Sequence, residues 1–257
     1  MQVFESSHSQ SGDPEIEILQ VRREVISFHG SEEIKRKYLT RVRRRRLTGR
    51  LVQGLGEKKG KGGAIWCTLL SSNCWSYEDD LGIPNQLAFL EDELFEALSS
   101  DQAMLFPEQF LEAIPVGVDL YPAFWRFALF TLLDEANGLM AYYEDKQAVF
   151  RVADFYRKAL AGQEIPLNEY LSVRKAAGPA NGRELRVLDA LDPLDPQAFV
   201  SAGYILNSLA FMDRRAAIDL YGCSDSDVDY REFETVRANV WRNKLLEYLS
   251  SPARPDR

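Results

Sequence analysis

Few side chains in this sequence are suited to acid–base or metal chemistry. Of its 257 residues only two are histidines, His8 and His29, and His8 lies in a polar stretch rich in serine and glutamine. A catalytic dyad or triad built on histidine therefore depends on His29 alone. The sequence also lacks the paired histidines of zinc and di-iron motifs. We expect neither a metal nor a cofactor.

The thiols are the other candidate nucleophiles. Cys67, Cys74 and Cys223 are few, odd in number and not spaced as C-x-x-C, which indicates reduced thiols and a cytoplasmic location. A thiol beside a basic loop can have a lowered pKa and act as a nucleophile, whereas an isolated cysteine among apolar residues is more often part of the core. One alternative function is therefore an enzyme that uses the loop region 54–80. Its thiols and carboxylates would be Cys67, Cys74, Glu78, Asp79 and Asp80.

Two loops resemble ligand-binding motifs but lack the residues that do the binding. Residues 54–63 contain five glycines, yet a glycine stands where a P-loop needs the hydroxyl that binds magnesium. Asp225, Asp227 and Asp229 are spaced like the start of an EF-hand loop that lacks its glycine and its final glutamate. These patterns predict a solvated loop and an N-cap for the last helix.

The charge distribution is the strongest functional signal. The chain has 31 basic and 39 acidic residues, a net charge of −8. Residues 34–61 contain twelve basic residues and one acid, a net charge of +11, so the other 229 residues carry −19. A segment so unlike the rest of its chain attracts either an external anion or the protein's own acidic surface.

Our first hypothesis is a non-catalytic interaction or regulatory protein that binds an anionic macromolecule, an acidic protein surface or a nucleic acid, through residues 34–61. A helix there spreads four consecutive arginines over about 300° of its circumference, and Arg45 falls near the apolar stripe. Arg45 must then pair with a carboxylate, or the helix must stand away from the body. The competing interpretation is that the arginines bridge to acidic helices such as 91–96. The candidate binding residues are Arg43, Arg44, Arg46, Arg50, Lys58, Lys59 and Lys61.

These residues must be positioned by helices, because apolar side chains recur at helical spacing along most of the chain. Start and stop signals predict helices over 31–52, 84–98, 107–114, 120–136 and 145–161, and from 229 onward. The acids of 91–96 are expected on a solvated face. The most apolar helix, 120–136, is expected at the centre of the core, since its apolar run is shorter than the ~20 residues of a membrane span. Weaker helical patterns cover 167–177, 197–212 and 214–221.

The fold class is all-α, an irregular multi-helix globular domain, with at most one short β-hairpin near 15–28 or 64–70. We expect disordered tails at 1–14 and 251–257 and a single domain over 15–250, with a sub-boundary near 163–182. A structural or assembly subunit that completes its core with a second chain is a third candidate function.

Several segments resemble an uncharacterised family of bacterial and phage-encoded helical proteins. The resemblance is carried by IKRKYLTRVR, GKGG…CTL, YEDDLGIPNQLAFLEDELFEAL, FPEQFLEAIPVGVDL, RVADFYRKALAG and RNKLLEYL. It covers most of residues 31–162 and the last helix. Because the family has no assigned activity, the resemblance implies a shared helical fold and no chemistry. Its members carry a histidine after the CTL segment, where this chain reads SSNCWSYE.

Overall fold

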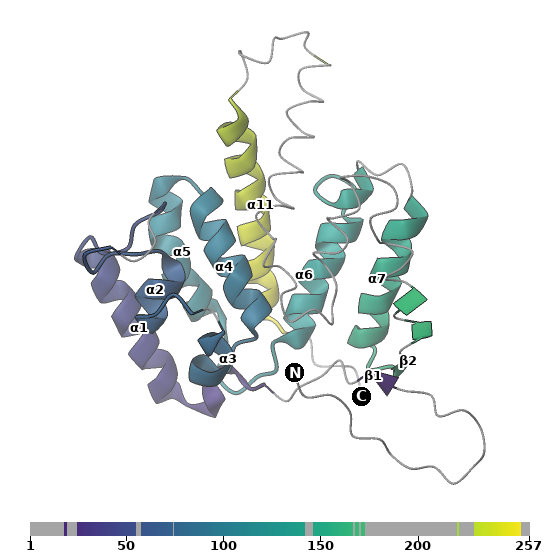
Figure 1. Ribbon diagram of the computed structural model, residues 1–257, viewed down its shortest axis with the longest axis horizontal. Coiled ribbons are helices and arrows are strands. Elements are labelled where there is room, and N and C mark those ends of the chain that lie inside the picture. Colours follow the sequence, from purple (N-terminus) through teal and green to yellow (C-terminus); the bar gives the residue numbers. More distant parts are fainter. Residues whose placement is uncertain are drawn as a thin grey trace.

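The protein is an all-α assembly of packed helices, as the sequence predicts (Figure 1). The computed structural model describes residues 18–19, 25–54, 58–73, 75–141, 146–166, 168–169, 171–172, 220 and 229–252. Its helices are α1 (Glu32–Leu47), α2 (Ala64–Leu69), α3 (Ser76–Leu81), α4 (Asn85–Ala97), α5 (Ser100–Ala113), α6 (Tyr121–Leu133), α7 (Lys146–Leu160) and α11 (Tyr230–Ser250), with short 3-10 turns at Ser27–Gly30 and Leu139–Ala141.

The helices pack around a core in which α6 and α11 are central. Helix α11 lies against α4, α5 and α6, while α7 covers the other side of α6 (Figure 1). Ten of the thirteen residues of α6 are buried, which confirms the prediction of a central apolar helix. Trp241 of α11 is fully buried and meets Phe127 of α6 edge to face, with ring centroids 5.5 Å apart. An aromatic contact of this kind fixes how the two helices cross.

Helix α1 begins where the sequence predicts and ends earlier. The Ser31 hydroxyl accepts a hydrogen bond from the Ile34 amide and caps the first turn. The helix stops at Leu47 because Gly49 adopts a left-handed conformation, φ +62°, and the Arg50 amide bonds back to the Arg45 carbonyl. The stop signal is thus Gly49, three residues before the predicted end of the helix at 52.

Helix α5 is longer than predicted and contains a proline in its interior. The sequence suggests a start at Pro107, yet the helix begins at Ser100. Ala103, Phe106 and Phe110 form a buried stripe along it. Burying that stripe stabilises the helix by more than the one backbone hydrogen bond that proline removes.

The β structure differs from the predicted hairpin. Residues 64–69 form helix α2, so a strand there is wrong. Strand β1 (Ile18–Leu19) pairs antiparallel with the distant strand β2 (Ile165–Pro166). This two-residue pair joins segments far apart in the sequence and makes no local hairpin.

Several predictions lie outside the described residues. These are the tail at 1–14, the helix at 197–212, most of the helices at 167–177 and 214–221, and most of the tail at 251–257. Among the helices that the structure describes, none is long and apolar enough to cross a membrane.

Candidate functional site

The basic segment divides into cations that hold the fold together and cations that face outward. On the inner side, Lys35 Nζ donates to the Glu112 and Ile114 carbonyls at 3.0 and 2.6 Å. Arg41 Nη1 donates to the Thr68 carbonyl at 2.7 Å. Both side chains reach the ends of neighbouring helices, α5 and α2, where carbonyls have no intrahelical partner and positive charge is favoured.

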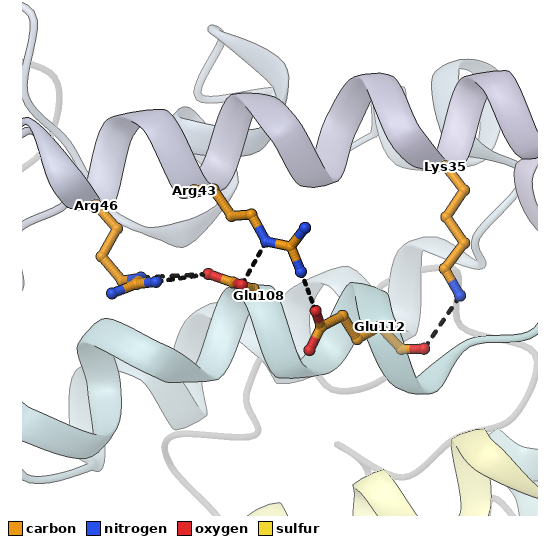
Figure 2. Close-up of polar contacts among 5 residues, drawn as sticks. All are labelled: Lys35, Arg43, Arg46, Glu108 and Glu112. Atoms are coloured by element: carbon orange, nitrogen blue, oxygen red, sulfur yellow. Dashed lines mark hydrogen bonds and ion pairs between the residues drawn. The ribbon is translucent and has the colours of Figure 1, made fainter.

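Arg43 and Arg46 are paired with acids of helix α5 (Figure 2). Arg43 Nε lies 2.5 Å from Glu108 Oε1 and its guanidinium also contacts Glu112. Arg46 Nη2 lies 3.0 Å from Glu108 Oε2. Both arginines, which the sequence offers as candidate binding residues, are thus paired within the protein, and their partners lie on α5 and not on 91–96. The sequence could not show this, because the packing of α1 against α5 decides it.

Glu108 is the centre of this ion-pair network. Burial raises the pKa of its carboxyl, but hydrogen bonds and charge from Arg43 and Arg46 outweigh that effect, so the pKa lies below its ordinary value. Such a carboxylate stabilises the fold above pH 4.5, its ordinary pKa, and the stabilisation is lost as the pH falls through the lowered value.

Replacing Glu108 with glutamine is therefore expected to lower stability at pH 7 by about 1 kcal/mol, the upper range for partly exposed pairs. Glu112→Gln should have a smaller effect, because its side chain is 46% exposed and meets one arginine. Urea unfolding midpoints at pH 7 and below pH 4.5 measure both variants. The loss of stability in Glu108→Gln should be smaller at the acid pH. A loss that is the same at both pH values would contradict the ion pairs of Glu108 with Arg43 and Arg46.

Among the described residues, Arg45 is neither paired with a carboxylate nor held away from the body, the two arrangements expected from the sequence. Its guanidinium stacks over the Trp66 ring at 4.2 Å from the centroid, and Nη1 donates to the Gly60 carbonyl at 3.3 Å. The aromatic face supplies the negative electrostatic potential that a carboxylate would otherwise provide. The contact also fastens the loop around Gly60 to the end of α1.

Five basic residues remain exposed at the end of α1 and in the loop after it, and we call them the cationic edge. None of the five forms an ion pair among the residues that the structure describes. The cationic edge consists of Arg44, Arg50, Lys58, Lys59 and Lys61.

The lysines of the cationic edge lie on a tight turn. The backbones of Lys58 and Lys61 exchange hydrogen bonds of 3.0 and 3.1 Å. Lys59 and Gly60 have φ values of +53° and +72°, the signs that a type I′ turn requires. The turn is fixed to the body where the Gly62 amide donates to the Arg50 carbonyl at 3.0 Å. It lies beside the end of α1, at the left margin of the molecule in Figure 1.

The thiol and carboxylate alternative gains no assembled site. Cys67 is buried, and burial raises the pKa of its thiol to about 12, whereas a nucleophilic cysteine needs a lowered pKa. His29 Nε2 lies 3.0 Å from the Asp79 carbonyl and is not paired with this thiol. Glu78 is half-buried, Asp79 and Asp80 are exposed, and Cys74 lies outside the described residues.

The structure also forms an acidic cavity that the sequence does not reveal. A cavity of about 660 Å³ lies between the end of α4, the start of α5 and the start of α11. Glu93, Glu96 and Glu234 line it together with Arg231. Burial, then the charges of Asp92, Glu96 and Glu234, raise the pKa of Glu93 to about 7.

The spacing of Glu93 and Glu96 is visible in the sequence, but Glu234 joins them only in the fold. Among the described residues, no cluster of acids, cysteines or histidines has the arrangement that holds a metal ion.

One acid of the predicted solvated face is instead fully buried. Glu91 of α4 has no exposed surface and accepts a hydrogen bond from the Tyr77 hydroxyl at 2.6 Å. Its other oxygen, Oε1, has no hydrogen-bond partner in the described structure. Burial raises the pKa of Glu91 to about 8. The packing of α2 and α3 against α4 covers a side that the sequence assigns to solvent.

Comparison with protein-family models, with curated proteins and with solved structures finds no match for this chain. Any function proposed for this site therefore has to be inferred from the geometry of the site.

Proposed function

We propose that the protein is a non-catalytic interaction protein that binds an anionic macromolecule through the cationic edge. The observation that supports this is the separation of ten of the twelve basic residues of 34–61 into two sets, while Arg36 and Lys37 are exposed in the first half of α1. Lys35, Arg41, Arg43, Arg45 and Arg46 are bound to groups of the protein itself. The five cations of the edge are exposed and have no acid partner among the described residues.

The location of the cationic edge suits an external anion. Charges on an exposed turn and on the last turn of a helix are accessible from outside without any change in the fold. The Lys58–Lys61 turn is braced by its own backbone hydrogen bonds and by the attachment of Gly62 to Arg50. A ligand would thus meet charges that are already in place, and little ordering entropy would be lost on binding.

Reversing charge on the edge is expected to abolish polyanion binding without unfolding the protein. The test variant is Arg44→Glu/Lys58→Glu/Lys61→Glu, applied with the wild type to immobilised heparin and eluted with a salt gradient. We expect the wild type to be retained and the variant to lose at least about tenfold in affinity at low salt, because three favourable charges become repulsive. Arg43 and Arg46 are left intact, because a glutamate there would face Glu108 and disturb the fold.

The matched control reverses three exposed cations on the opposite side of the molecule. Lys146→Glu/Arg151→Glu/Arg157→Glu on α7 changes the net charge by the same amount. Its retention should stay close to that of the wild type. Equal losses in the two variants would show that net charge alone governs retention, and absence of wild-type binding would overturn the proposal.

A further inference from the structure

We infer that the anion bound by the cationic edge is the phosphate backbone of a nucleic-acid duplex, contacted without regard to base sequence. This inference rests on the proposed function and specifies its partner. It follows from what surrounds the cations, from the shape of the helix that carries Arg44, and from the charge of the rest of the chain.

The surroundings of the edge are unlike the centre of a protein–protein interface. Such centres are enriched in aromatic residues and arginine and depleted in lysine. Here three of the five cations are lysines. The nearby ring of Trp66 is buried, and its face is covered by Arg45. The one large exposed apolar residue in the described part of this end of α1 is Leu47, which is 76% exposed. Repeated point charges without an aromatic anchor suit a row of phosphates.

The same surroundings favour a duplex over a single strand. Proteins that hold single strands stack the bases on exposed aromatic rings. Within the described residues of the edge and its neighbours, Tyr38 and Trp66 are both buried, so neither offers a free ring face. A duplex keeps its bases stacked on one another, so it needs no aromatic ring from the protein, and it presents its phosphates on the outside.

The geometry of α1 argues against reading of base edges. A recognition helix lies in the major groove and directs one face, with several side chains, at the base edges. Helix α1 packs against α5 on one side and α2 on the other, which limits the face that could enter a groove. Its inward cations are occupied by carbonyls and carboxylates of those helices. Contact is thus confined to the sugar-phosphate backbone of the nucleic acid. Such contacts position a protein on a duplex but carry no direct sequence information.

The charge of the remaining chain restricts how a duplex can approach. Outside residues 34–61 the net charge is −19, so other faces of the protein repel a polyanion. Binding should therefore occur in one orientation and weaken steeply with salt. If all five cations contact phosphates, the plot of log affinity against log salt has a slope of about −4.5, a loss of about 500-fold between 50 and 200 mM.

The experiment measures fluorescence anisotropy of a labelled 20-base-pair DNA duplex with the full-length protein at four salt concentrations. The competitors are the single strand, poly-glutamate and vesicles containing phosphatidylserine. We expect two unrelated duplexes to bind alike and better than every competitor. The Arg44→Glu/Lys58→Glu/Lys61→Glu variant should lose binding, while the α7 triple variant retains it.

Each other outcome overturns a distinct statement. Retention on heparin with a duplex affinity no better than that for poly-glutamate or vesicles would overturn the nucleic-acid inference and leave the proposed function standing. Tighter binding of the single strand, or a tenfold preference between the two duplexes, would overturn the backbone-only duplex mode. If the wild-type protein binds neither the duplex nor heparin, both the nucleic-acid inference and the proposed function are overturned.

Discussion

Replacing Gly82 with alanine is expected to destabilise the protein by more than about 4 kcal/mol, a loss seen only for severe single substitutions. Gly82 ends α3 at φ +62°, and a Cβ there would lie 2.0 Å from the Ile26 carbonyl oxygen. That oxygen cannot easily retreat. It accepts a hydrogen bond from the His29 amide, and the adjacent Ser27 is bonded to Pro115 and Val118.

Gly49 provides a matched control for this prediction. It has the same φ of +62°, but no described residue beyond its two chain neighbours lies within 4 Å of the position that an alanine Cβ would occupy there. Gly49→Ala should therefore cost only the left-handed conformation itself, about 1–2 kcal/mol. Urea unfolding of both variants measures the difference, and circular dichroism would register an unfolded Gly82→Ala protein. Equal losses in the two variants would contradict the predicted clash.

Raising the pH from 5 to 8 is expected to destabilise the wild-type protein, and the Glu91→Gln substitution should remove most of that loss. The pKa of Glu91 rises from 4.5 to about 8 on burial, so the folded state holds its proton more tightly than the unfolded state. The stabilisation is fully present below 4.5 and is lost as the pH rises through about 8. At about 1.4 kcal/mol per pH unit, the loss between pH 5 and pH 8 is about 3 kcal/mol.

Urea unfolding at pH 5, 6.5 and 8 tests this prediction. Glu91→Gln keeps a neutral side chain of the same shape beside Tyr77, so its stability should vary less with pH than that of the wild type. Glu93, whose pKa rises to about 7, contributes a residual loss in the same direction. Glu135→Gln, at an exposed position, is the control and should follow the wild type. A wild-type stability that stays level or increases toward pH 8 would contradict the raised pKa that burial gives the Glu91 carboxyl.

Local sequence signals located most of the helices. The caps at Ser31 and Asp229 are confirmed by their side-chain hydrogen bonds to the amides of the first turn. Helix α7 ends at Leu160, close to the predicted end at 161, and is followed by Gly162 in the left-handed conformation. Such signals work because a cap bonds to residues two or three positions away and needs no tertiary contact. These signals failed at Pro107, which they predict as a helix start. Burial of the apolar side of α5 against other helices outweighs the tendency of proline to begin a helix.

The candidate site was only half visible in the sequence. The excess of positive charge in 34–61 and its candidate residues Arg44, Arg50, Lys58, Lys59 and Lys61 are explicit in the chain. Which of the basic residues are already used was not, because each partner comes from another helix. Glu108 and Glu112 lie more than sixty positions from Arg43 and Arg46, and no spacing rule connects them.

By itself, the sequence determined the helical class, the approximate helix positions and the uneven distribution of charge, since all three depend on composition and on contacts within a few residues. The tertiary structure decided which acids and arginines meet. It paired Arg43 and Arg46 with α5, set Arg45 on Trp66 and buried Glu91. The physical reason is that burial and Coulomb attraction depend on distance in space, and only the packing of the helices converts positions in the chain into such distances.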